Sequence, residues 1–418
     1  MTGTDPAAAA AELPGREQPS PDTLGGYVRL WLQGVRAGEL GSLPIIVGLV
    51  VIFITFGLLN DVFLTERNFT NLLLQMAAIA TIAIGVVFVL LIGEIDLSVA
   101  FVSAVGGVVM TLLLRPDDPG WPWWICIAAG LAVTTAIGFV QGLVITKAGV
   151  PSFVVTLAGF LVWSGVVLIL TTRATRVGTI RIQDDAVIGI ANDFLSDVWG
   201  WIVGTALVAG YALAQLRTAL GRRAGGLVGK PPVVIGLQTA GLASVTFLGV
   251  WYANKDRGVP KVTLILGILL LFWSFVASRT RFGRHVYAVG GNPEAARRAG
   301  IAVDRIRIAV FMISGFMAGV GGILIASRLR SVATGQGGGN LLLLVIAAAV
   351  IGGTSLFGGT GRVVSALLGA LVIASIQNGM DLLGLASGEK FVITGLVLLG
   401  AVLVDAYAKR RRAAAGGV

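Results

Sequence analysis

Cysteine and histidine are almost absent from this sequence. Cys126 is the single cysteine and His285 the single histidine among 418 residues. One cysteine excludes an intramolecular disulfide and a thiolate cluster, and one histidine excludes a multi-histidine metal site. A Ser-His-Asp triad also cannot be assembled around this isolated histidine. We therefore predict no catalytic residues, no metal site and no cofactor bound by this chain.

Charged residues are also scarce, at 12% of the chain, whereas hydrophobic residues make up 56% and the mean hydropathy is +0.90. These values exclude an ordinary soluble protein and indicate an integral membrane protein. The net charge of +10 would by itself suit a nucleic-acid-binding protein. However, the lysines and arginines separate apolar segments and are not interleaved with aromatic residues that stack on bases. We therefore predict a lipid bilayer environment and no nucleic-acid partner.

Uncharged runs long enough to cross a hydrocarbon core of about 30 Å recur along the chain. One of them, 331–361, is broken by two glycine clusters, so only 341–351 is expected to be helical. That segment is either a discontinuous helix or a re-entrant element that faces protein or a water-filled cavity. We predict an all-α polytopic helical bundle of about 10–12 transmembrane segments with broken or re-entrant helices. The other runs are 42–60, 68–93, 97–114, 119–146, 148–172, 198–216, 231–254, 262–278, 308–327, 363–380 and the shorter 391–404.

Pairs of glycines four residues apart occur within two of these runs. Gly138 and Gly142 form one pair, and Gly315 and Gly319 form the other. Small residues at this spacing let helix backbones approach closely, so both pairs predict tight helix packing.

Basic residues are distributed unevenly between alternate loops. If twelve segments each cross once, 20 of the 31 lysines and arginines lie on the side that holds both termini. Positively charged loops remain in the cytoplasm, so we place both termini and the loop 279–307 there. Residues 1–41 lack the pattern of a signal peptide and are predicted to be a disordered tail, followed by the transmembrane domain 42–408 and a basic tail 409–418.

The chain lacks an evident source of energy. Residues 225–231 resemble a phosphate-binding loop only superficially, because Pro231 stands where serine or threonine would bind magnesium. Ionisable residues within the apolar runs, which a carrier driven by an ion gradient would need, are limited to Glu94, Asp96 and Asp405. If nucleotide energy is used, a separate ATPase subunit must supply it. An ATP-independent carrier or channel is the alternative class.

The polar loop 279–307 contains a complete set of helix-end signals. Asn292 can cap the free N–H groups and Pro293 suits the first helical position. Glu294 complements the positive end of the helix, Arg297 complements the negative end, and Gly300 permits a left-handed exit. We predict a short surface helix over 293–299 that docks into a soluble partner. The alternatives are an interfacial helix facing lipid and a merely solvated loop.

Polar residues at the ends of the apolar runs, or inside them, are candidates for the transport pathway. Glu94, Asp96 and Ser98 form a turn between two runs, which is either a capped hinge or a gate. Thr156 offers a hydroxyl one turn inside the run that begins near Pro151. The remaining candidates are Gln377 and Asn378, which either bind solute hydroxyls or, as the safer interpretation, tie helices together, and Asn340, which ends a glycine cluster.

Five motifs occur in the order seen in the membrane subunits of bacterial ABC importers for ribose, xylose and similar monosaccharides, and the chain resembles this family over most of its length. They are Gly-Glu-Ile-Asp-Leu-Ser at 93–98, Pro-Ser-Phe-Val-Val-Thr-Leu at 151–157, Tyr-Ala-Val-Gly-Gly-Asn-Pro-Glu-Ala-Ala at 287–296, Gly-Gly-Thr-Ser-Leu-Phe-Gly-Gly at 352–359 and Asn-Gly-Met at 378–380. An ordered set is far more specific than a single motif. The resemblance implies a bacterial inner-membrane homodimer that works with an ABC ATPase and an extracytoplasmic sugar-binding protein.

The resemblance also assigns roles within the chain. It implies that Glu294, Ala295, Ala296 and Gly300 belong to the motif that contacts the ATPase. Compared with a ribose-type subunit, residues 198–254 add two spans, and this enlarged form is similar to the xylose-transport subunit. The alternative within transport is an importer of branched-chain amino acids or of another small hydrophilic solute.

Overall fold

A computed structural model describes residues 25–26, 28–29, 32–33, 43–116, 120–225 and 231–414 of the chain. The predicted tail 1–41 and the last part of the basic tail, 415–418, lie almost entirely outside these residues. The chain divides into two compact units. One contains Gly41–Gly200 and Val250–Lys409, and we call it the core unit. The inserted hairpin, Trp201–Gly249, belongs to the other unit, and its limits fall inside the predicted insertion 198–254.

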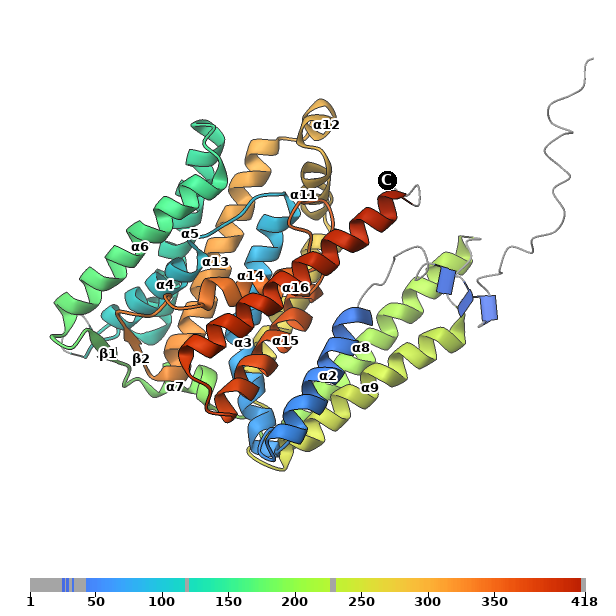
Figure 1. Cartoon of the computed structure of the whole chain (residues 1–418), viewed down its shortest axis with the longest axis horizontal. Coiled ribbons are helices and arrows are strands. Elements are labelled where there is room, and N and C mark those ends of the chain that lie inside the picture. The colour runs from blue at the N-terminus through green and yellow to red at the C-terminus, as the bar shows by residue number, and fades with distance from the viewer. Residues whose placement is uncertain are drawn as a thin grey trace, which may run out of the picture. The chain divides into compact units, whose positions relative to one another are not determined.

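Each of the twelve predicted segments contains a helix (Figure 1). Eight helices are long and apolar enough to cross a membrane, and three shorter ones, α2, α4 and α14, are also apolar. The twelfth segment lies in α16, which continues into the basic residues as far as Ala414. The helices of these twelve segments are α2 Leu43–Leu59, α3 Glu66–Leu91, α4 Val99–Leu113, α5 Trp123–Lys147, α6 Ser152–Ala174, α8 Asp197–Ala224, α9 Pro232–Asn254, α10 Lys261–Arg279, α13 Val303–Leu329, α14 Leu341–Ile351, α15 Val364–Leu382 and α16 Ser387–Ala414.

The core unit is built around α13, which packs against α3, α4 and α5 (Figure 1). The two glycine pairs lie in this packing. A side chain at Gly138 would overlap the backbone of Phe311 on α13, and one at Gly315 would overlap the backbone of Thr134 on α5. The prediction of close helix packing at both pairs is confirmed, because only glycine lets these backbones approach so closely.

The broken segment 331–361 also has the predicted form. Helix α14 covers Leu341–Ile351, and it packs against α3 and α15 with Val345 and Ala348 fully buried. Gly358 and Gly359, with φ of 84° and 73°, lie in an irregular turn after it. This arrangement keeps irregular backbone against protein, where its polar groups find partners that lipid would not supply.

Four smaller elements were not predicted. Part of the loop 279–307 is the helix α11, Arg281–Gly291, so that segment is helical and not a loop as expected. The other three are α7, Asp185–Asn192, and the strands β1, Thr179–Arg181, and β2, Ser331–Ala333, which pair antiparallel with Ile180 opposite Val332. Strands of three residues are too short to show the alternation from which a strand is recognised in sequence.

Candidate functional site: the rim helix and the polar turn

The predicted surface helix is present as α12, Pro293–Arg298, which ends one residue earlier than expected. The Ala295 N–H donates a hydrogen bond of 3.0 Å to Asn292 Oδ1, as expected of an N-cap. Gly300 has a φ of 82°, the left-handed exit that its position predicted. Arg297 also donates to Glu294 Oε2 at 2.9 Å. The local sequence therefore accounts for the start and the end of this helix.

The α12 helix presents most of its predicted contact residues to solvent. Asn292, Pro293, Glu294, Ala295, Arg297 and Gly300 are exposed. Ala296 is only 4% exposed, and its carbonyl accepts a hydrogen bond from the Ile301 N–H at 3.0 Å. Ala296 therefore anchors the helix to the core unit, while the exposed residues form the surface that a partner can reach. We call this surface the rim helix surface.

The α11 helix fastens the rim helix to two other parts of the core unit. Gly290 lies so close to the Leu91 carbonyl at the end of α3 that any side chain would overlap it. The Gly359 N–H donates to the same carbonyl at 2.9 Å, and the Tyr287 hydroxyl donates to the Gly361 carbonyl at 2.8 Å. Partial burial raises the pKa of Tyr287, so its hydroxyl remains a donor at neutral pH. Helix α11, which directly precedes α12 in the chain, therefore contacts both α3 and the turn after α14.

Ion pairs connect the same region to the polar turn 93–98. Arg307 Nη2, at the start of α13, lies 3.1 Å from Glu94 Oε1, with side chains 26% and 14% exposed. Asp304 lies 3.9 Å from both Lys147 and Arg297. These contacts place Glu94, Lys147 and the loop 279–307 at one end of the core unit, which is the grouping on which the predicted topology depends.

Asp96 is the buried centre of the polar turn, at 4% exposure. Its Oδ1 accepts hydrogen bonds from the Ser98 N–H at 3.0 Å and the Ser98 hydroxyl at 2.7 Å. Its Oδ2 accepts from the Ser314 hydroxyl of α13 at 2.8 Å. Gln141 of α5 donates to Ser98 Oγ at 2.8 Å. A single carboxylate thus holds α4 in register with α13 and, through Ser98, with α5.

Thr156 of α6 contacts this turn. Its hydroxyl lies 2.9 Å from the Ser152 carbonyl and 3.2 Å from the Ile95 carbonyl. The Ile95 N–H donates in return to Ser152 Oγ at 3.3 Å. Four of the predicted pathway residues, Glu94, Asp96, Ser98 and Thr156, are therefore brought together. Ser314 and Gln141 were missed, although each is a polar side chain within an apolar run.

The other three candidates lie elsewhere. Asn378 and Asn68 exchange side-chain hydrogen bonds of 2.7 and 2.9 Å, which tie α15 to the start of α3. Gln377 donates to Thr394 Oγ1 at 3.0 Å and ties α15 to α16. These two amides therefore have the helix-tying role. Asn340 stands at the N-cap of α14, where its side chain caps no N–H of that helix.

Comparison with known proteins identifies the family to which this chain belongs. The family model described as the permease component of the branched-chain amino acid transport system matches residues 68–405. The chain is 36% identical to the xylose transport system permease protein of Escherichia coli strain K12, covering 93% of this chain and 96% of that protein. It is 31% identical to the ribose import permease protein of Bacillus subtilis strain 168, covering 88% and 94%. No solved structure matches.

The chain belongs to this family of permeases. It is a transport subunit and not an enzyme, and its many apolar helices make it a multi-pass inner-membrane protein. The resemblance drawn from the five motifs is thereby confirmed. Permeases of this family work with an ATPase and a substrate-binding protein.

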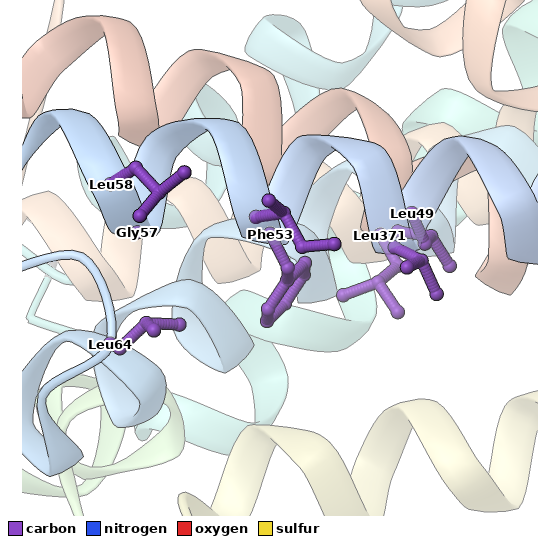
Figure 2. A pocket seen from close by; sticks show the side chains of 8 residues that line it. Leu49, Phe53, Gly57, Leu58, Leu64 and Leu371 are labelled. Atoms are coloured by element: carbon purple, nitrogen blue, oxygen red, sulfur yellow. The ribbon is translucent and has the colours of Figure 1, made fainter.

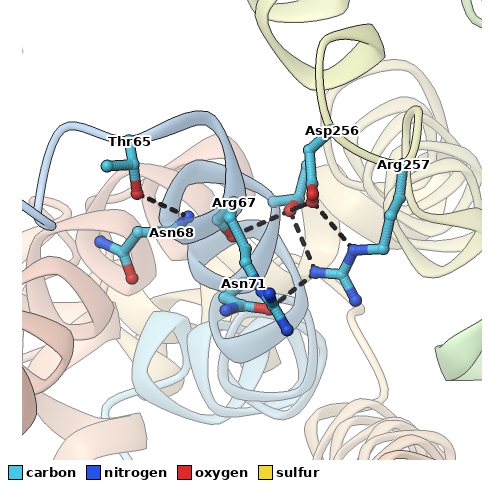
Figure 3. Close-up of polar contacts among 7 residues, drawn as sticks. Thr65, Arg67, Asn68, Asn71, Asp256 and Arg257 are labelled. Carbon is cyan, nitrogen blue, oxygen red and sulfur yellow. Dashed lines mark hydrogen bonds and ion pairs between the residues drawn. The ribbon is translucent and has the colours of Figure 1, made fainter.

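The first turns of α3 and the residues that follow α9 form a second polar cluster (Figure 3). Arg257 donates to Asp256 Oδ2 at 2.9 Å and to Asn71 Oδ1 at 3.0 Å, and the Thr70 hydroxyl donates to Asp256 at 2.8 Å. Burial alone would raise the pKa of Asp256. The hydrogen bonds from Arg257 and Thr70 and the charges of Arg257 and Arg67 outweigh it and lower that pKa. The cluster clamps the loop after α9 to the first turns of α3.

An apolar groove lies between α2, the turn before α3 and α15 (Figure 2). Its volume is about 640 Å³. It offers no hydrogen-bonding side chain, so a sugar that entered it would lose hydrogen bonds to water without replacement. The lining residues are Leu49, Val50, Phe53, Ile54, Gly57, Leu58, Leu64 and Leu371.

Proposed function

We propose that this chain is the membrane subunit of an ABC importer for a monosaccharide, with D-xylose or another pentose as the best substrate. The observation that carries the proposal is the 36% identity to a xylose transport permease over 96% of that protein's length. The rim helix supports it, because six exposed residues on or beside a capped helix form a surface that an ATPase can bind. No covalent chemistry is required of the chain.

In this mechanism the chain supplies a path and two conformational states. An extracytoplasmic binding protein delivers sugar at the outer face, and ATPase subunits hold α12 at the cytoplasmic face. ATP binding at the partner changes the relative stability of the inward and outward states, which is sufficient to move a solute. We propose that two copies of the chain form the path between them. Movement of α12 is transmitted through α11 to α3 and to the turn after α14. The Leu91 carbonyl at the end of α3 packs against Gly290 of α11 and accepts a hydrogen bond from the Gly359 N–H of that turn.

Sugar-stimulated ATPase activity of the reconstituted complex tests the proposal. We expect stimulation by a binding protein loaded with a pentose, weaker stimulation with hexoses, and none with leucine or another branched-chain amino acid. If only the amino acid stimulated the ATPase, the substrate would be a branched-chain amino acid and not a sugar. Failure of the permease to co-purify with any ATPase, together with uptake in the absence of ATP, would instead show an independent carrier.

A further inference from the structure

The turn between β2 and α14, residues 334–340, reaches deep into the core unit. We call it the glycine loop. A Cβ at Gly337 would meet the carbonyl of Ala100 and the side chain of Ala104 on α4. Helix α4 runs on from these residues to Leu113, over about 9–13 residues or about 14–20 Å. Helix α14 then leads away for 11 residues, or about 16 Å, toward the turn that contacts Leu91. The glycine loop therefore lies near the middle of a hydrocarbon core of about 30 Å.

Irregular backbone at this depth is tolerated where it is covered by protein or lines a path for water and solute. Gly337 and Gly339 have φ of 87° and 64°, so the chain turns here in a conformation that favours glycine. The loop is covered on one side by α4, whereas Gly335 and Gly339 are exposed on the other. This is the position in which broken helices of transporters place solute-binding groups.

Gln336 is the polar side chain in this loop whose hydrogen-bonding groups are unused. Its Nε2 and Oε1 are both buried, and neither has a hydrogen-bond partner among the described residues. Gly107 leaves room for the amide, since a Cβ there would lie 3.1 Å from Nε2. In contrast, the amides of Gln141 and Gln377 both donate to neighbouring helices. A buried unpaired amide costs free energy of about 1–3 kcal/mol, which a ligand that pairs with it would offset.

An aromatic pair lies beside the same loop. The rings of Phe101 and Phe160 are 4.8 Å apart in an edge-to-face arrangement, and a Cβ at Gly338 would lie 3.7 Å from Phe101 Cζ. A planar amide supplies two donors and an acceptor without charge, and a hydroxyl group can pair with either. An apolar ring next to a few placed polar groups is the usual make-up of a site for a small neutral ligand.

We propose that Gln336 binds hydroxyl groups of the sugar as it passes through the membrane, with Phe101 against the apolar face of the sugar ring. This proposal rests on the proposed function and deepens it, because it locates a solute contact within the path. The glycine loop brings the amide to mid-membrane, and the fixed helices α4 and α14 on either side of it hold it there.

Transport by the reconstituted complex tests the proposal. Each sugar is supplied at a saturating concentration of sugar-loaded binding protein. The substrates are D-xylose, D-ribose and their monodeoxy analogues, and the variants are Gln336→Leu and Gln336→Glu. Ser375→Ala is the matched control, because Ser375 Oγ in α15 is also buried without a partner in the described chain. For wild type we expect at least one deoxy analogue to be transported about tenfold more slowly than its parent, roughly the effect of one hydrogen bond.

In Gln336→Leu we expect transport of the parent sugar to fall to the rate of that analogue, while the analogue itself changes less than about twofold. Ser375→Ala should keep the wild-type ratio. The role of Gln336 would be overturned if both Gln336 variants kept the wild-type ratio of parent-sugar to deoxy-analogue transport rates. It would also be overturned if that ratio fell equally in Ser375→Ala. If wild type transports none of the monosaccharides, the proposed function fails instead. Equal thermal stability of the variants shows that folding is not responsible, and Gln336→Glu provides the readout if Gln336→Leu does not fold.

Discussion

At the scale of single residues, the permease uses its few polar side chains within the membrane helices mainly to hold helices together. Asn68 pairs with Asn378, and Gln377 with Thr394, at the end of the core unit remote from Glu94. Asn68 lies in the first turn of the 26-residue α3 and Glu94 lies beyond its last residue, so most of a helix about 39 Å long separates them. Uncharged amide ties of this kind stabilise a helix bundle. The ionic contact of Glu94 is different, because it connects the polar turn to the segment that follows the rim helix.

The Glu94–Arg307 ion pair gives a prediction at this scale. The pair is largely buried, so a single reversal, Glu94→Arg or Arg307→Glu, places two like charges side by side in a medium that screens them poorly. We expect each reversal to lower ATP-driven transport at least about tenfold, while the double reversal recovers most of it. Uptake and ATPase co-purification are measured at equal membrane abundance. Equal losses in the single and double variants would show that the pair does not connect the turn to α13.

At the scale of elements, α12 is short, and its position depends on its ends and on Ala296. Gly300→Val would force a β-branched residue into a left-handed conformation at a φ of 82°, at a cost of roughly 1–2 kcal/mol. Glu294→Lys would reverse the charge next to a helix N-terminus and on the surface facing the partner. We expect both variants to insert normally and to lose ATPase association or coupled transport severalfold.

Gly291→Ala is the control for these variants. Gly291 is also an exposed glycine of this segment, but it closes α11 without a left-handed φ, and nothing lies within 4 Å of an added Cβ. It should therefore behave as wild type. Pull-down of the ATPase and sugar uptake report the result. Normal values for both Gly300→Val and Glu294→Lys would mean that the rim helix surface is not the docking surface.

The contact between α5 and α13 gives a prediction about stability. The Cβ of Gly138→Ala would overlap the Phe311 carbonyl, which is backbone and cannot move aside as a side chain would. We expect a loss of roughly 1–3 kcal/mol or more in stability, seen as a lower melting temperature in detergent. Gly165→Ala on α6 meets nothing within 4 Å and serves as control. An unchanged melting temperature for Gly138→Ala would show that α5 and α13 are not in close contact.

At the scale of the whole molecule, orientation follows from charge. If each of the twelve segments crosses once, 20 of the 31 lysines and arginines fall on the side that holds both termini, and the contacts of Glu94, Lys147 and Asp304 bring three segments of that side together. In a Cys126→Ala background, cysteines at Ala224 and Ala295 should react with an impermeant thiol reagent only from the cytoplasm, and one at Asp185 only from outside. Replacement of Cys126, which is a buried free cysteine, removes the native thiol. Labelling of the Ala295 position from outside would invert the orientation and remove the rim helix from the ATPase side.

The sequence by itself determined the features of this permease that have strong local signals, although it missed the helices α7 and α11. Apolar runs identified the membrane class and the twelve helical segments, because a bilayer requires long uncharged helices. Asn292, Pro293 and Gly300 located α12 because capping and left-handed exits act within a few residues. The same reasoning found α14, since glycine clusters on both sides end it.

Only the tertiary structure decided which polar residues meet. Glu94 and Arg307 are separated by more than two hundred residues, and no local rule pairs them. For Gln377 and Asn378 the sequence favoured helix ties over a pathway role, and only the structure located their partners on α16 and α3. Gln336 was not singled out in the sequence, because an amide in a glycine-rich turn is ordinary at a surface. Its significance comes from the depth to which α4 and α14 carry it and from the absence of a partner in the described chain, and both depend on how distant segments pack.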